Sequence, residues 1–150
     1  MFVLGQSYGG GIIFYIDGTG LHGLIAAPSD QGSGDITWGC SGISIPGTSW
    51  SIGTGQYNTM LIVLGCSELG IAARICDNLE LNGYSDWFLP SSDELYLMYL
   101  QKDAIGAFGT QYWCSSEYDA DDAWVLDFYS GYNEAIDKSS LPSVRAVRAF

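Results

Sequence analysis

The sequence predicts one α+β domain, in which two or three short helices are segregated from an antiparallel sheet and joined by long ordered loops. The first observation is the composition, because 20 glycines and 47% hydrophobic residues in a chain of 150 indicate many turns around a real core. The second is the order of patterns, with a hairpin first, helical spacing in the middle and alternation in the last third.

The start of the chain predicts a hairpin followed by a loop. Residues 11–16 and 21–27 are apolar, and the Asp-Gly-Thr-Gly sequence between them favours a turn. Residues 28–53 are rich in Ser, Gly and Pro, and a stretch of this length is typically a functional or pinned loop. The first five residues lack a basic region and a long apolar core, so we expect no signal peptide here.

The middle of the chain predicts helices. Residues 59–64 fit either a helix or a buried strand, and we expect a helix that is opened by Asn58 or Thr59. Residues 70–79 carry apolar side chains at helical spacing. A Ser-Ser-Asp-Glu capping box predicts a third helix over residues 91–102.

The last third of the chain predicts strands. Residues 112–115, 123–129 and 143–150 are short β-like segments, and we expect residues 112–129 to lie antiparallel beside residues 143–150. We expect one core to hold, or to lie beside, three of the five tryptophans: Trp87, Trp113 and Trp124.

Residues 116–137 combine seven carboxylates with four Tyr or Phe and one Trp, and contain no Lys or Arg. Strand alternation turns Trp124, Leu126 and Phe128 to one face, and the residues between them to the other. Tyrosine supplies contact area at low entropy cost and small polar residues supply adaptable hydrogen bonds, as in antibody paratopes. We therefore predict an exposed ligand-binding face made of Tyr118, Asp119, Asp121, Asp122, Val125, Asp127, Tyr129, Tyr132, Asn133, Glu134, Ile136 and Asp137. A solvated β-meander whose acids prevent aggregation is the alternative.

The charge limits the classes of partner. A net charge of −12 with only five Lys and Arg argues against nucleic acid and against an anionic membrane surface, since both bind through clustered cations. No apolar run approaches the roughly 20 residues of a membrane helix, so we expect no membrane insertion. A protein or glycan ligand remains, although simple solubility also explains the charge.

The four cysteines form no Cys-x-x-Cys motif, so neither a zinc site nor a redox motif is indicated. Cys66 and Cys76 flank one helical segment and are placed to pair if the protein is exported. Buried free thiols are at least as good an interpretation.

Catalytic and metal-binding residues are sparse. His22 is the only histidine and is interpreted as a structural or surface residue. The spacing of Asp119, Asp121 and Asp122 leaves room for a structural calcium, but surface charge is the simpler interpretation, and we expect no cofactor.

Two arginines near the C-terminal end of the sequence predict a buried ion pair. An odd separation turns Arg145 and Arg148 to opposite sides of a strand. We expect one of them to be buried and paired with Glu117 or Asp86, because a buried charge needs a partner.

Motifs along nearly the whole chain are the basis of a family resemblance: residues 10–15, 22–27, 38–39, 58–59, 72–73, 83–91, 93–95, 112–117, 123–124, 131, 138 and 144–148. Together they resemble the C-terminal domain of bacterial collagen-like adhesins, within the C-type-lectin-like fold shared with formylglycine-generating enzymes. The family usually has Ser where this chain has Cys114. The calcium-dependent sugar motifs of true C-type lectins, such as Glu-Pro-Asn, are absent from the sequence.

The C-terminal part of the sequence is also similar to the C-terminal part of the variable proteins of diversity-generating retroelements. Their variable segment lies between a Trp-Ser-Ser-Ser-Glu-like start and a Val-Arg-Ala-Val-Arg-Ala-Phe-like end, which corresponds here to residues 112–150. Such systems mutate adenines in a template. The Tyr, Asp and Ile residues of the predicted face fit the outcomes of mutated Asn codons.

These resemblances imply that residues 1–150 form a single non-enzymatic recognition domain of C-type-lectin-like fold. It would belong to a larger protein at the cell surface, outside the cell or on a phage particle, and a homo-oligomer would suit a fibre tip. A structural or trimer-forming cap is the alternative. An enzyme on the formylglycine-generating scaffold is a third interpretation, disfavoured because that chemistry needs two nearby C-terminal cysteines and only Cys114 lies there.

Overall fold

A computed structural model describes residues 1–32 and 34–150 of the chain. Its elements are, in order, β1 (Ser7–Tyr8), β2 (Gly11–Ile16), β3 (Gly23–Ala26), α1 (Gly55–Gly65), α2 (Ala72–Asp77), α3 (Ser92–Leu100), α4 (Lys102–Ile105), β4 (Gln111–Glu117), β5 (Asp122–Asp127), β6 (Asn133–Asp137) and β7 (Val147–Ala149). The order confirms the α+β class. The C-type-lectin-like assignment stays a prediction.

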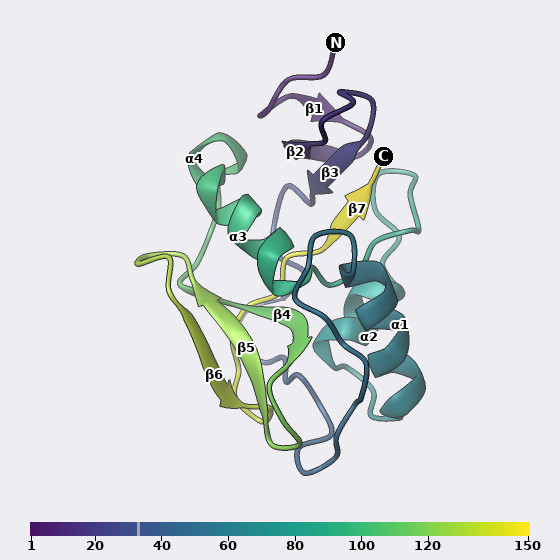
Figure 1. Cartoon of the computed structure of the whole chain (residues 1–150), viewed down its shortest axis with the longest axis vertical. Helices are drawn as coiled ribbons and strands as arrows, with labels where there is room; N and C mark the ends of the chain where they lie inside the picture. The colour runs from purple at the N-terminus through teal and green to yellow at the C-terminus, as the bar shows by residue number, and fades with distance from the viewer. Residues whose placement is uncertain (33) are drawn as a thin grey trace.

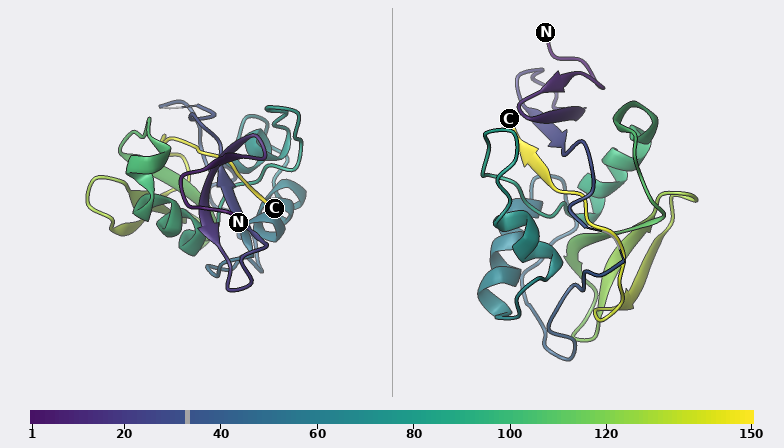
Figure 2. Two further views of the ribbon diagram at one scale, coloured as in Figure 1. Left: turned by 90° about the horizontal axis from the view of Figure 1, so that it is seen from above. Right: turned by 180° about the vertical axis from the view of Figure 1, so that it is seen from behind.

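The strands form two antiparallel sheets rather than the single sheet that we expected. One sheet has the order β1-β2-β3-β7 and the other has the order β4-β5-β6 (Figure 1). Because β7 pairs with β3, the two chain ends lie at the same end of the molecule (Figure 2).

The expected pairing of residues 112–129 with residues 143–150 is therefore wrong. Residues 111–117 and 122–127 do form a hairpin, but Ser143 makes only a single parallel bridge to Tyr112 before β7 leaves for the other sheet. Alternation predicts a strand but not its neighbour, which is chosen by packing between distant segments.

The helices lie on two sides of the molecule, with α1 and α2 on one side and α3 and α4 on the other (Figure 1). Two clusters of buried side chains result. Trp113 and Val125 belong to the cluster with α1 and α2, whereas Tyr112 and Leu126 belong to the cluster beneath α3. The β4–β5 hairpin is therefore packed on both faces.

The N-termini of the helices were predicted correctly for α3 but not for α1. The predicted capping box of α3 is confirmed, because the Ser91 hydroxyl accepts the Glu94 N–H and the Glu94 carboxylate accepts the Ser91 N–H. However, α1 begins at Gly55, so the prediction that Asn58 or Thr59 opens it is wrong. Both residues lie within α1, and their buried side chains form hydrogen bonds with neighbouring segments of the chain.

The cysteine prediction needs correction. A disulfide joins Cys40 to Cys66, while Cys76 and Cys114 are free and buried. Cys66 and Cys76 belong to the same buried cluster, but the sulfur of Cys66 is bonded to Cys40, which leaves Cys76 as a free thiol. The bridge fastens the long loop to the end of α1.

Two further expectations concern the loop and the tryptophans. Residues 28–32 and 34–53 contain no helix or named strand, as predicted for a loop. Trp87 and Trp113 share one core cluster, but Trp124 packs against the other and stays partly exposed, so the single-core prediction is wrong for Trp124. In the described part of the chain, no helix is both long and apolar enough to cross a bilayer.

Candidate ligand-binding surface

The last residue of β4 is a fixed point for the long loop. One oxygen of Glu117 accepts the N–H of Ile45 at 2.9 Å and the ammonium of Lys138 at 2.6 Å. The same ammonium donates to the carbonyl of Ile43 and lies 4.7 Å from the centre of the Trp38 ring. Glu117 and Lys138 are thus structural.

Arg145 and Arg148 are both buried, and each has a carboxylate partner. Arg148 contacts both oxygens of Asp86 at 2.7 and 2.9 Å, which confirms one of the two expected pairings. Arg145 pairs with Asp30 at 2.8 Å and also donates to the carbonyl of Ala107. Arg145 was not expected to have Asp30 as its partner, because the two residues lie at opposite ends of the sequence.

A buried polar network holds the segment on either side of Trp50. The amide of Asn58 accepts the N–H of Ser49, and donates to the Ser49 carbonyl and the Ser115 hydroxyl. The Ser116 hydroxyl donates to the same Ser49 carbonyl and accepts the N–H of Ser92. The two serines of β4 therefore anchor the long loop against the start of α3.

Glu94 completes this network from the other side. Its carboxylate accepts the N–H groups of Gly53 and Ser91 at 2.9 and 2.8 Å. Burial raises the pKa of the Glu94 carboxyl, and these backbone hydrogen bonds act in the opposite direction. The Ser91 hydroxyl donates to the carbonyl of Ser51, so both neighbours of Trp50 are held.

The predicted face is divided between the two ends of β5. Tyr118, Asp119, Asp121 and Asp122 lie at the β4–β5 turn, and Asp137 lies opposite Asp122 on β6. The second group lies at the β5–β6 turn and the adjoining part of β6: Asp127, Tyr129, Tyr132, Asn133 and Glu134. The structure thus brings together two groups of predicted residues rather than one.

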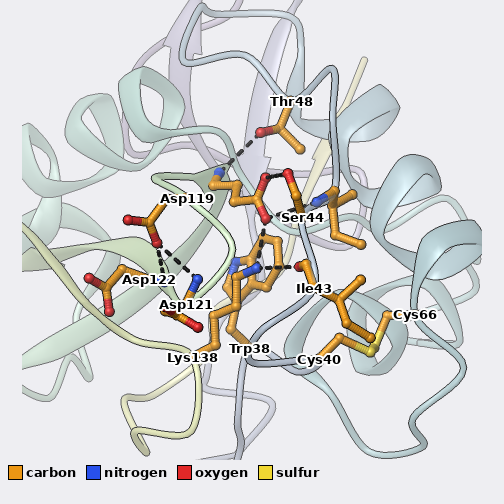
Figure 3. Close-up of polar contacts among 12 residues, drawn as sticks. Trp38, Cys40, Ile43, Ser44, Thr48, Cys66, Asp119, Asp121, Asp122 and Lys138 are labelled. Carbon is orange, nitrogen blue, oxygen red and sulfur yellow. Dashed lines mark hydrogen bonds and ion pairs between the residues drawn. A yellow bond between two sulfur atoms is a disulfide. The ribbon is translucent and has the colours of Figure 1, made fainter.

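The β4–β5 turn is rich in uncompensated negative charge. The Asp119 carboxylate accepts the N–H groups of Asp121 and Asp122, which stabilises the turn (Figure 3). Desolvation, and then the nearby charges of Asp119 and Asp137, raise the pKa of Asp122. The Ser139 hydroxyl donates to Asp137 and lowers the pKa of that carboxyl.

At the β5–β6 turn, Asp127 accepts the N–H groups of Tyr129 and Ser130, so its side chain stabilises the turn. The two tyrosines point away from the protein, with 90% of Tyr129 and 77% of Tyr132 exposed. An open cavity of about 510 Å³ lies beside Tyr129, between α4 and residues 106–110.

Val125 and Ile136 do not belong to an exposed face. Val125 is fully buried, and Ile136 is half-buried against the same core cluster. The alternation was predicted correctly, but the face opposite Trp124 is covered by protein because the hairpin lies between two clusters.

An aromatic cluster that was not predicted from the sequence lies on the face of β5 that carries Trp124. The Trp124 ring lies 5.3 Å from both Trp50 and Tyr118, at nearly perpendicular angles. Trp50 and Tyr118 are each more than half exposed. The available signal was an aromatic residue, Trp50, in the Ser- and Gly-rich loop that also contains Trp38.

In the part of the chain that the structure describes, few metal-ligating or nucleophilic side chains come together. Within residues 1–32 and 34–150, the one group of three close metal-ligating side chains is Cys40, Cys66 and Glu68, and its two sulfurs form the disulfide. Burial raises the pKa of the Cys114 thiol to about 12, which disfavours the nucleophilic thiolate. His22 is exposed and lies near the carbonyl of Phe150.

Comparison with known proteins places the scaffold in a family. Residues 33–148 match the model of the Lcl C-terminal domain. The chain belongs to this family. The match confirms the resemblance to the C-terminal domain of collagen-like adhesins. Some of the motif residues of this Lcl C-terminal domain form ion pairs, namely Glu117 with Lys138 and Asp86 with Arg148. A comparison with curated proteins gives no match.

A solved structure with a similar fold is that of a fimbrial protein from Bacteroides ovatus ATCC 8483. The likeness has a TM-score of 0.56 at 13% sequence identity, and covers 83% of this chain. This Lcl C-terminal domain spans only 35% of that protein's chain. At this low identity, the similarity shows a shared fold and no more.

Proposed function

We propose that this domain recognises a ligand without catalysis, as an adhesin-like domain of a surface fibre, through the exposed acidic and aromatic surface of the β4–β5–β6 sheet. The observation that carries the proposal is the exposure of three tyrosines, at 57% for Tyr118, 90% for Tyr129 and 77% for Tyr132. Exposed tyrosines over a rigid scaffold are typical of protein-recognition surfaces.

The scaffold beneath this surface supports the proposal. Both turns are stabilised by an aspartate side chain, Asp119 in one and Asp127 in the other. The adjoining loop is held by buried hydrogen bonds and by the Glu117–Lys138 pair. Rigid elements limit the conformational entropy lost on binding, which favours affinity.

A surface location is supported by two observations. The Cys40–Cys66 disulfide is typical of proteins in oxidising compartments. The fimbrial protein of similar fold is, by its name, part of a surface fibre. We therefore place the larger protein that carries this domain outside the cell, at the cell surface or on a phage particle.

The proposal includes diversification of residues 112–150 by a retroelement. The tyrosines and aspartates at the two turns are exposed or partly exposed, where substitution is tolerated. The test is the genomic neighbourhood, where we expect a reverse transcriptase gene and a near-copy of the codons for residues 112–150. A neighbourhood with neither would contradict diversification, and the binding residues of this domain would then be constant.

The test of ligand recognition is a binding assay with fluorescently labelled domain on a panel of bacterial and eukaryotic cells. We expect the Tyr129→Ala/Tyr132→Ala double variant to lose at least about 30-fold in affinity, because tyrosine hot spots contribute about 2 kcal/mol each. The matched control is Tyr57→Ala, which removes a tyrosine of 56% exposure from α1. Equal binding by all three proteins would contradict recognition by this turn, and a lack of binding by all three would favour a structural cap.

A further inference from the structure

All five lysine and arginine side chains of the domain make internal contacts. Arg145, Arg148 and Lys138 form the three ion pairs of the described residues. Arg74 donates to backbone carbonyls at the end of α1, and Lys102 donates to the carbonyl of Phe128. Only three of the 17 acidic side chains are partners in these ion pairs, so nearly all free charge on the surface is negative.

This charge lies next to an aromatic surface at the β4–β5 turn. We call Trp50, Tyr118, Trp124 and Asp122 the acid–aromatic site. Asp122 and Trp124 are two residues apart in β5 and face the same side of the sheet. Trp50 and Tyr118 flank the Trp124 ring. Aromatic faces beside a carboxylate attract cations, and arginine most of all.

One donor in this site is unsatisfied. The indole N–H of Trp124 is the one buried side-chain polar atom without a hydrogen-bond partner in residues 1–32 and 34–150. Such a donor destabilises the free protein, so each instance calls for an explanation. A ligand carbonyl that reached this N–H would satisfy it. A peptide offers such a carbonyl beside every side chain.

The site is also held in place before any ligand arrives. The carbonyl of Trp50 accepts the N–H of Asp93 at the start of α3, at 3.0 Å. The flanking residues Ser49 and Ser51 accept hydrogen bonds from buried side chains. The Trp50 ring packs against Trp124 on one side and is 53% exposed, so a tryptophan with a fixed backbone is presented where a ligand can contact it.

We propose that the acid–aromatic site binds an arginine or lysine side chain in an extended basic segment of a protein partner. The cation lies against the aromatic rings and pairs with Asp122, and a peptide carbonyl accepts the Trp124 indole N–H. This inference rests on the proposed recognition function and assigns its partner class. Charge complementarity favours a basic peptide over a neutral glycan, because a glycan can form hydrogen bonds but no ion pair with the carboxylates.

The test is a titration of ¹⁵N-labelled domain with the capped peptide Gly-Arg-Gly-Arg-Gly, followed by the indole N–H resonances. We expect the Trp124 resonance to shift, and the same peptide with citrulline in place of arginine to bind at least 10-fold more weakly. Trp50→Ala and Tyr118→Ala should each weaken binding about 10-fold while leaving the net charge unchanged. Tyr57→Ala, an exposed tyrosine elsewhere, should have no effect.

Three outcomes would overturn the proposal. Arginine-peptide binding that is equal in wild type, Trp50→Ala and Tyr118→Ala would show only diffuse attraction to an acidic surface. A Trp124 shift with chitotriose but not with the arginine peptide would assign the site to glycans. A complete lack of shift with the arginine peptide, while Tyr129→Ala/Tyr132→Ala still abolishes cell binding, would reject this partner class and leave the recognition function intact.

Discussion

The ammonium nitrogen of Lys138 lies 2.6 Å from a carboxylate oxygen of Glu117, and both side chains are almost completely buried. The pair connects the end of β4 to the residue that follows β6, and its hydrogen bonds to Ile43 and Ile45 extend the connection to the long loop. The contact thereby fixes the framework on which the β4–β5 turn is displayed.

Removing one partner of this pair should be costly, because the other charge is left buried and unpaired. We expect Glu117→Ala to lower the free energy of unfolding by about 3–5 kcal/mol in urea denaturation. Glu134→Ala, which removes an exposed carboxylate from β6, should change it by less than about 0.5 kcal/mol. The double variant Glu117→Leu/Lys138→Met should be more stable than Glu117→Ala. Equal stability of Glu117→Ala and wild type would contradict the structural role.

The Cys40–Cys66 bridge should contribute stability by restricting the unfolded chain. It closes a loop with a sequence separation of 26, for which chain entropy predicts about 3–4 kcal/mol. The variant Cys40→Ser/Cys66→Ser should therefore have a lower urea midpoint. Reducing agent should lower the midpoint of the wild type but leave that of the double variant unchanged.

Thiol labelling checks the pairing itself. Burial raises the pKa of both free thiols, Cys76 and Cys114, so neither should react with a thiol reagent in the native protein. Unfolding without reductant should expose two reactive thiols, and peptide mapping should assign them to Cys76 and Cys114. A labelled Cys40 would contradict the bridge.

Elements whose formation depends on residues close together in the sequence were predictable. The hairpin of β2 and β3 follows from two apolar runs and a turn, and α3 follows from the Ser91–Glu94 capping box. The partner of β7 was not predictable, because pairing with β3 brings together residues from the two ends of the chain. The same limit applies to the Arg145–Asp30 pair and to the disulfide.

The candidate site was predictable only in part. Alternation identifies residues that share a face, but it does not say whether that face meets solvent or a second layer. Val125 was misassigned for this reason, whereas Tyr118, Tyr129 and Tyr132 lie at turns and are exposed as predicted. Trp50 was missed because its place beside Trp124 is fixed by tertiary contacts that span the molecule.

Substitutions at Val125 and Tyr129 distinguish buried from exposed positions of the predicted face. Val125→Ala removes two buried methyl groups and should lower the free energy of unfolding by about 2 kcal/mol. Tyr129→Ala should change it by less than about 0.5 kcal/mol, because the side chain makes few contacts. Urea denaturation of both variants measures the difference. A larger loss for Tyr129→Ala than for Val125→Ala would show that the two faces have been assigned the wrong way round.

The Arg148–Asp86 pair should contribute stability that depends on pH. The hydrogen bonds from Arg148 lower the pKa of Asp86 below its unfolded value of about 3.9. The folded state therefore binds its proton less readily than the unfolded state, so the contribution is present above about pH 4 and is lost as the pH falls through the lower, folded-state pKa. Because Asp86 is about half exposed, at 48%, we expect no more than about 1 kcal/mol.

The measurement is the difference in melting temperature between wild type and Asp86→Asn, followed from pH 7 to pH 2.5. Wild type alone would not isolate the pair, because the raised pKa of Glu94 contributes stability that is lost in the opposite direction, as the pH rises. The difference between the two proteins cancels that contribution, since Glu94 is present in both. We expect wild type to melt higher at pH 7 and the gap to close below about pH 4. A gap that stays constant across this range would mean that Asp86 acts through its shape and hydrogen bonds rather than its charge.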